Sequence, residues 1–132
     1  MEIEKSEQEI EDYLSRNLEI IEQGLKLIRR QYKTKYGVID ILCFDKEGNR
    51  VAIEVKKYAD TNSPGQLSKY VFALKKEFPG SFVRGILVSS KISKEIMELC
   101  SHFYLDFREL NEVTELMPTI RWPPSIPHYD KF

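Results

Sequence analysis

Residues Gly37–Lys57 read GVIDILCFDKEGNRVAIEVKK, and this stretch decides the fold. Two apolar runs rich in β-branched residues, 38–44 and 51–55, flank a polar loop that contains Asp45 and Gly48. Such runs on either side of turn-forming residues are typical of a β-hairpin. We therefore expect two antiparallel strands here, around which the other elements assemble.

The register of this hairpin brings charged side chains together. A loop of five residues pairs Phe44 with Arg50, and the same register sets Asp40 opposite Glu54. Opposed carboxylates repel each other across a sheet, and a hard divalent cation offsets that repulsion because it takes carboxylate oxygens as ligands. Lys56 lies two residues beyond Glu54 and therefore leaves the same face of the strand. We predict that two acids and an amine converge there on a cation.

The structural alternative is a charged ladder on the surface of the hairpin. The four nearest neighbours of Asp40 in the sequence, Val38, Ile39, Ile41 and Leu42, are all apolar. Burial of an unpaired carboxylate among such residues is costly. This environment favours a site over a ladder.

The order Asp40, thirteen residues, then Glu54-Val55-Lys56 is the pattern of the PD-(D/E)XK nuclease superfamily, also called restriction-endonuclease-like. Over residues 6–110 the chain also resembles the nuclease domain of the archaeal NucS/EndoMS endonucleases. The matching segments are 17–25 (NLEIIEQGL), 37–40 (GVID), 66–70 (QLSKY) and 84–88 (RGILV). The resemblance implies an α/β fold with a restriction-endonuclease-like mixed central sheet of about five strands flanked by helices.

The resemblance further implies a metal-dependent endonuclease that hydrolyses phosphodiester bonds in DNA, with Mg²⁺ or Mn²⁺ as its cofactor. Asp40 and Glu54 would hold one or two ions, helped by the Val55 backbone carbonyl. Lys56 would orient the attacking water or stabilise the charge of the phosphorane. Because a metal lowers the pKa of its water, the chemistry needs no strong protein base.

Other site residues come from helices. Glu7 falls where the family carries an acid on its first helix, and Glu11, one turn on, is its rival. The alternative role for Glu7 is an interaction with the helix dipole alone. Gln66 and Tyr70 lie at i and i+4 of a predicted helix, and similar nucleases place this pair beside the site, with the glutamine near the metal, water or phosphate. Their alternative is packing by Tyr70 and a solvated Gln66.

The net charge of −1 hides an asymmetry, because residues 1–23 carry eight acidic and two basic groups. A basic cluster follows within residues 26–35, and such a cluster attracts phosphates whatever the overall charge. The alternative is a strand edge protected by charge. The predicted nucleic-acid contacts are Arg29, Arg30, Lys33, Lys35, Lys57 and Tyr70.

Periodicity and capping residues predict the remaining elements. Ser6 and Glu9 form a capping box that begins a helix, and Ser63 with Pro64 begins another. Ser93 caps a third helix. The expected ranges are strand 25–32, helix 63–76, strand 82–89, helix 94–103 and strand 105–107.

We expect a nuclease-like domain over residues 1–112 and a tail over 113–132, rich in proline and aromatic residues, that packs on the domain or binds a protein partner. Cys43 and Cys100 form no Cys-x-x-Cys motif and are expected to be buried thiols. No apolar run reaches the roughly 18 residues of a membrane span, so we expect an intracellular protein without membrane contact.

Two functions from different classes follow. The first is a DNA endonuclease, a homodimer that is structure-specific for mismatched, branched or flapped DNA. The second is a non-catalytic module that keeps the nuclease fold and binds nucleic acid or protein. NucS/EndoMS proteins carry an N-terminal domain ahead of the nuclease domain, whereas this sequence begins close to the nuclease helix, so their substrate choice does not transfer. Junction cleavage, as in the small archaeal Holliday-junction resolvases, is a competing expectation.

Overall fold

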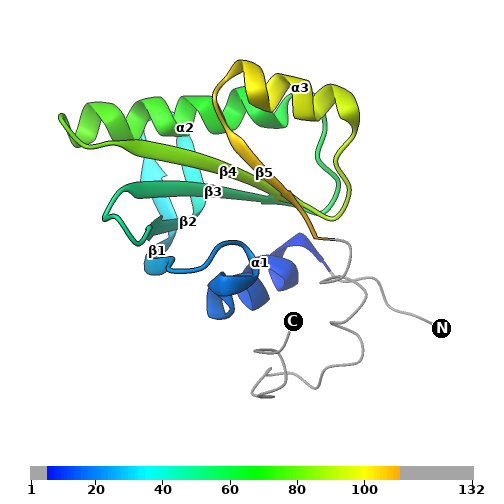
Figure 1. Ribbon diagram of the computed structural model, residues 1–132, viewed down its shortest axis with the longest axis horizontal. Coiled ribbons are helices and arrows are strands. Elements are labelled where there is room, and N and C mark those ends of the chain that lie inside the picture. Colours follow the sequence, from blue (N-terminus) through cyan, green and yellow to red (C-terminus); the bar gives the residue numbers. More distant parts are fainter. Residues whose placement is uncertain (1–5, 111–132) are drawn as a thin grey trace.

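In the computed structural model, which describes residues 6–110, a five-stranded mixed sheet is covered by helices on both faces (Figure 1). The strand order is β1-β2-β3-β4-β5. The α/β class with a mixed central sheet, expected from the sequence, is confirmed. The elements are α1 (Glu7–Arg16), the short 3-10 helix η1 (Leu18–Ile20), β1 (Lys26–Thr34), β2 (Gly37–Phe44), β3 (Arg50–Lys56), α2 (Ser63–Glu77), β4 (Val83–Ser89), α3 (Lys94–His102) and β5 (Asp106–Glu109).

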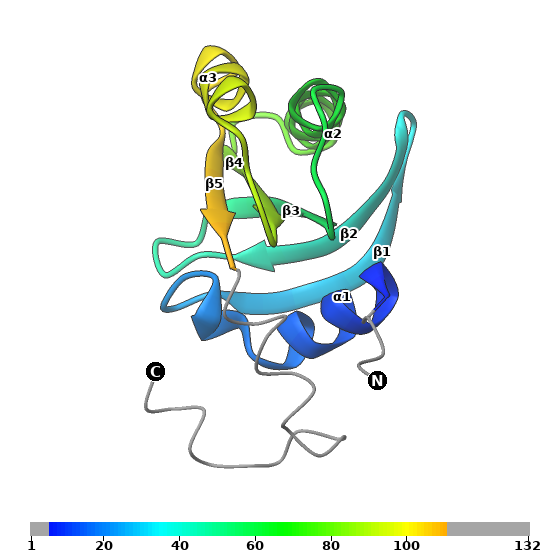
Figure 2. The ribbon, with the colours of Figure 1, turned by 90° about the vertical axis from the view of Figure 1, so that its right-hand side faces the viewer.

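The sheet combines two antiparallel hairpin pairs with two parallel pairs. β1 pairs with β2 and β2 with β3 in antiparallel fashion, whereas β3, β4 and β5 run parallel. Parallel neighbours require crossovers, and α2 and α3 provide them on one face while α1 covers the other (Figures 1 and 2). The C-terminal end of the central strand β3 therefore lies near the beginnings of α1 and α2, at one end of the strands (Figure 1).

Each face of the sheet has its own core. The core under α1 contains Ile10, Tyr13, Leu14, Leu18, Ile21, Ile41, Cys43, Val51, Ile53, Val55, Ile86 and Val88. The core under α2 and α3 contains Ile39, Leu42, Ala52, Leu67, Tyr70, Val71, Leu74, Val83, Leu87, Ile92, Ile96, Cys100 and Leu105. Both cysteines are buried free thiols, as the sequence indicated. The strands buried on both faces are the ones that carry long apolar runs.

Local sequence accounts for the helix ends. Glu9 N–H donates to Ser6 Oγ and Ser6 N–H donates to Glu9 Oε1, which completes the predicted capping box of α1. Ser93 caps α3 as expected. The N-cap of α2 is Asn62 rather than Ser63, because the Ser63 hydroxyl instead exchanges hydrogen bonds with Asp60 in the preceding turn.

The predicted tail, 113–132, and its boundary with the domain fall outside residues 6–110, which the structure describes. Among the described residues, no helix combines the length and the apolar character that crossing a membrane demands.

Candidate active site

The hairpin has the register that the sequence predicts. Phe44 pairs with Arg50, and the ladder continues to Ile41 and Ile53, one residue short of Asp40 and Glu54. Beyond that point, the Asp40 side chain takes the place of a backbone carbonyl of β2 as the acceptor for β3: Val55 N–H donates to Asp40 Oδ2 at 2.8 Å. Asp40 is thereby fixed beside the strand that carries the second acid.

Glu54 is a buried carboxylate in unfavourable surroundings. Its side chain is only 4% exposed, and its Oε1 atom accepts no hydrogen bond from any described residue. Burial, followed by the negative charge of Asp40 and a hydrogen bond with it, raises the pKa of Glu54 to about 8. Burial also raises the pKa of Asp40, against the effect of the Val55 N–H. The two acids therefore lie together, and burial with their mutual repulsion keeps Glu54 protonated at neutral pH unless a cation lies between them.

Lys56 is the third member of the predicted triad. Its Nζ lies 3.7 Å from Glu54 Oε2. Burial opposes the charge on this ammonium, yet the carboxylates of Glu54, Glu7 and Asp40 raise the pKa of Lys56 overall. Lys56 is thus protonated at neutral pH, a cation that can bind a phosphoryl oxygen or orient a water.

Glu7 approaches the same place from α1. Its Oε2 accepts a hydrogen bond of 3.0 Å from Lys57 N–H, directly after Lys56. Its charge also contributes to the raised pKa of both Glu54 and Lys56. The sequence-predicted first-helix acid is therefore close enough for its charge to act on Glu54 and Lys56.

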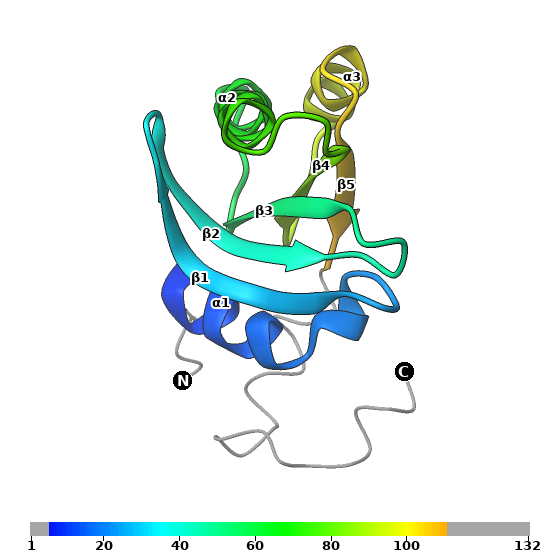
Figure 3. The ribbon, with the colours of Figure 1, turned by 90° about the vertical axis from the view of Figure 1, so that its left-hand side faces the viewer.

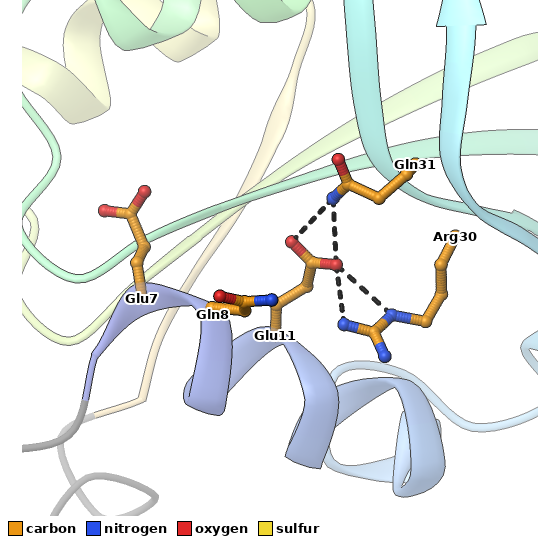
Figure 4. A pocket seen from close by; sticks show the side chains of 5 residues that line it. All are labelled: Glu7, Gln8, Glu11, Arg30 and Gln31. Atoms are coloured by element: carbon orange, nitrogen blue, oxygen red, sulfur yellow. Dashed lines mark hydrogen bonds and ion pairs between the residues drawn. The ribbon is translucent and has the colours of Figure 1, made fainter.

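Glu11, the rival acid, is held by β1 (Figure 4). Arg30 donates to Glu11 Oε2 through Nη2 at 2.8 Å and Nε at 3.2 Å, and Gln31 Nε2 lies 3.0 Å from both Glu11 oxygens. Arg30 also bonds to Asp12. Together with Glu7 and Gln8, these side chains line a hollow of about 410 Å³. Sequence reasoning missed Gln31, since a glutamine in a strand carries no distinguishing pattern.

α2 contributes the predicted glutamine and tyrosine. Gln66 Nε2 donates to the Tyr70 hydroxyl at 2.7 Å. Burial and then the charge of Glu54 raise the pKa of Tyr70, so this ring lies beside the acid pair. Gly37 packs against it: a Cβ at Gly37 would lie 3.0 Å from the Tyr70 hydroxyl. The structure thus brings both helix α2 residues to the site.

The predicted nucleic-acid contacts fall into two groups. Arg29, Lys33 and Lys35 have exposed side chains on the edge strand β1 and its turn. Arg30 instead makes ion pairs with two acids of α1, and Lys57 places its Nζ 5.7 Å from the centre of the Tyr58 ring. Of these cations, Arg30 has its charge held by acids of α1, whereas Arg29, Lys33 and Lys35 are exposed to solvent.

The donor set suits a hard cation. A buried oxygen of Glu54 without a partner, beside Asp40, offers the carboxylate ligands that Mg²⁺ and Mn²⁺ prefer. Within residues 6–110, no three His, Cys, Asp or Glu side chains converge closely enough to form a complete protein cage. Such a pair fits Mg²⁺ in particular, because this ion is usually bound by one or two carboxylates and keeps several waters.

Fold and site together define an α/β domain that presents a carboxylate pair and a lysine at the end of a mixed sheet. Residues 6–122 match the family described as the endonuclease NucS C-terminal domain, and the chain belongs to that family.

Individual proteins similar to this chain support the family assignment. Endonuclease NucS of Pyrococcus furiosus is 40% identical over 106 residues, which are 80% of this chain and 39% of that protein. A crystal structure of a repair endonuclease from Pyrococcus abyssi is 36% identical with a TM-score of 0.74, covering 83% of this chain and 49% of that one. A structure of an EndoMS complex with double-stranded DNA is 32% identical with a TM-score of 0.75, covering 83% and 46%. The chain therefore spans less than half the length of these relatives.

Proposed function

We propose that this chain is the catalytic domain of a Mg²⁺- or Mn²⁺-dependent DNA endonuclease of the PD-(D/E)XK type, specific for a DNA structure such as a mismatch, branch or flap. The observation that carries the proposal is the buried Glu54 oxygen without a partner beside Asp40, with the Lys56 ammonium 3.7 Å from the other Glu54 oxygen. The matching family and the named endonucleases among its relatives support the reaction class.

The proposed roles follow from the geometry. Asp40 and Glu54 would hold the cation, with Glu7 and the Val55 carbonyl as further ligands, directly or through water. A bound divalent ion supplies a water of lowered pKa and relieves charge at the phosphoryl oxygens. Lys56 remains protonated and stabilises negative charge on the reacting phosphate.

Gln66 and Tyr70 complete the proposed site from α2. The two residues lie one helical turn apart, and the hydrogen bond between them fixes the Gln66 amide against the Tyr70 hydroxyl. An amide held in this way can orient a water or a phosphate oxygen next to the acid pair.

DNA is the proposed substrate, and exposed cations are its proposed electrostatic contacts. The exposed side chains of Arg29, Lys33 and Lys35 lie along the edge strand and its turn, where DNA phosphates can reach them. Lys57 and Tyr70 lie next to the site itself. We also propose, as one working assembly, a homodimer, since a two-fold pair of sites suits paired incisions. Light scattering of the purified chain tests this assembly.

Cleavage assays test the function. The full chain is incubated with Mn²⁺ or Mg²⁺ and with mismatched, flapped, branched and single-stranded DNA, alongside Asp40→Asn, Glu54→Gln and the matched surface control Glu47→Gln. We expect cleavage by the wild type and the control and a loss of at least about 100-fold in both site variants. Equal cleavage by all four proteins would rule out the site. DNA binding without cleavage would instead favour the non-catalytic module.

A further inference from the structure

Gln31 has an unusual backbone for its place in a strand. Its φ is 51°, in the left-handed region that residues other than glycine rarely adopt. The flanking pairs Arg30 with Ile41 and Tyr32 with Ile39 place Gln31 opposite Asp40 in the β1–β2 ladder. A strained residue of β1 is therefore paired with a residue of the proposed site on the neighbouring strand β2.

The partner strand is irregular at the same level. Ile39 and Ile41 are two residues apart and would share one face of a regular strand. Instead, Ile41 packs in the core under α1, and Ile39 packs in the core under α2 and α3. Both strands thus depart from regular geometry where Asp40 turns toward Val55 N–H. Backbone strain of this kind persists where surrounding contacts hold it, and it gathers at functional sites.

The contacts of Gln31 show what the strain achieves. The Gln31 amide lies 3.0 Å from both oxygens of Glu11, whose side chain is only 8% exposed. With the two hydrogen bonds from Arg30, it ties the middle of α1 to β1. An antiparallel strand of regular geometry would aim this side chain elsewhere.

α1 then connects this tie to the proposed metal ligands. Glu7 precedes Glu11 by one helical turn, and Figure 4 shows both side chains leaving the same side of the helix. Glu11 is fixed to β1, whereas Glu7 accepts the Lys57 N–H at the end of β3. The position of Glu7 therefore depends on how α1 is held at Glu11.

We propose that Gln31 is a positioning residue: its left-handed backbone delivers an amide to Glu11, which holds α1 where Glu7 reaches the Asp40–Glu54 pair. The inference rests on the proposed function, because Glu7 is a ligand only in that proposal. A purely structural role predicts that Gln31 affects stability alone. Positioning predicts an effect on cation affinity that passes through Glu7.

Gln31→Gly separates these roles. Glycine adopts positive φ without strain, so this variant keeps the backbone while it removes the amide. Mn²⁺ affinity of the full chain is measured by isothermal titration calorimetry for Gln31→Gly, Glu7→Gln and the double variant. Gln8→Ala, which alters another glutamine of the same hollow, is the control. Hydrogen exchange of the Lys57 amide in metal-free protein gives a second readout without activity.

We expect each single variant to bind Mn²⁺ about 10-fold more weakly, the range for groups that support metal ligands. The double variant should lie within about 2-fold of Glu7→Gln, because both changes act on one interaction. Faster exchange of the Lys57 amide in Gln31→Gly and unchanged binding by Gln8→Ala complete the expected result.

Three results would overturn the inference. Mn²⁺ affinity and Lys57 exchange could remain unchanged in Gln31→Gly, the two single effects could simply add, or Glu7→Gln could bind as the wild type does. In each case a loss of Mn²⁺ binding in Glu54→Gln would leave the proposed function standing. Wild-type Mn²⁺ binding by Glu54→Gln would instead remove the metal site and the positioning role together.

Discussion

Glu54→Gln is expected to stabilise the metal-free protein at alkaline pH and to remove its stabilisation by Mn²⁺. Burial and the charge of Asp40 raise the pKa of Glu54 from 4.5 to about 8, so the folded protein holds this proton more tightly than the unfolded chain. Protonated Glu54 therefore contributes stability below pH 4.5, and this contribution is lost as the pH rises through about 8. Glutamine is a neutral isostere that cannot lose a proton.

The size of the effect follows from the same shift. Each tenfold difference in proton affinity corresponds to about 1.4 kcal/mol, so the ionisation of an isolated Glu54 would destabilise the fold by at most about 5 kcal/mol. Asp40 shares the repulsion, and the Lys56 ammonium at 3.7 Å offsets part of it. We therefore expect Glu54→Gln to raise the free energy of unfolding by about 2–3 kcal/mol above pH 8.

Urea denaturation in EDTA measures this difference. Below pH about 4.5, where Glu54 is protonated in both the folded and the unfolded protein, the wild type and Glu54→Gln should agree within about 0.5 kcal/mol. The difference should open between pH 4.5 and about 8 and level off above that. Mn²⁺ at about 100 times its Kd should stabilise the wild type by about 2.7 kcal/mol and leave the variant unchanged. Glu47→Gln, an exposed acid of the β2–β3 turn, should follow the wild type throughout. An equal pH dependence in Glu54→Gln and the wild type would refute the reasoning.

Three further outcomes are expected. Gly37→Ala should lower cleavage about 10-fold, because its Cβ would lie 3.0 Å from the Tyr70 hydroxyl, and should also destabilise the fold, because the φ of 133° at Gly37 strains any residue with a Cβ; single-turnover rates and urea denaturation check this. Arg84→Met should destabilise the protein by about 3 kcal/mol at pH 7, since it removes the cation that pairs with the buried Asp45 and with the partly exposed Glu22 and Asp106. Hydrogen bonds from Asn49, and then from Arg84, lower the pKa of Asp45 against its burial, so this stabilisation should fade as the pH drops below about 4, as urea titrations would show. Lys33→Gln should weaken DNA binding and reduce the slope of log K against log salt by about 0.9, measured by fluorescence anisotropy.

The central hairpin was predictable because its information is local. A polar loop between two β-branched runs sets the register, and the register sets the neighbours of Asp40 and Glu54. Alternation then assigns Lys56 to the side of Glu54. The capping box at Ser6 is similarly local and sets where α1 begins, which places Glu7 in its first turn.

The packing of α1 was not predictable in the same way. Nothing in the local sequence distinguishes Arg30 from the exposed cations on the same strand, yet Arg30 is the counterion of Glu11 and Asp12. These ion pairs join residues that are separated by 18 and 19 positions in the sequence, and only the packed structure reveals them. The left-handed φ of Gln31 is also a tertiary effect, because glutamine has no intrinsic preference for it.

These two kinds of information correspond to two parts of the site. The hairpin alone provides Asp40, Glu54 and Lys56, all from adjacent strands of one sheet. The third carboxylate, Glu7, comes from a helix on the opposite face from α2, so its position depends on contacts that also hold the fold together. Because Glu11 is among the most buried acids of the described chain, the bonds that position α1 also satisfy a charge that would otherwise destabilise the core. Folding and assembly of the proposed site are consequently coupled through α1, whereas the acid pair opposes folding only when the pH rises toward the raised pKa of Glu54.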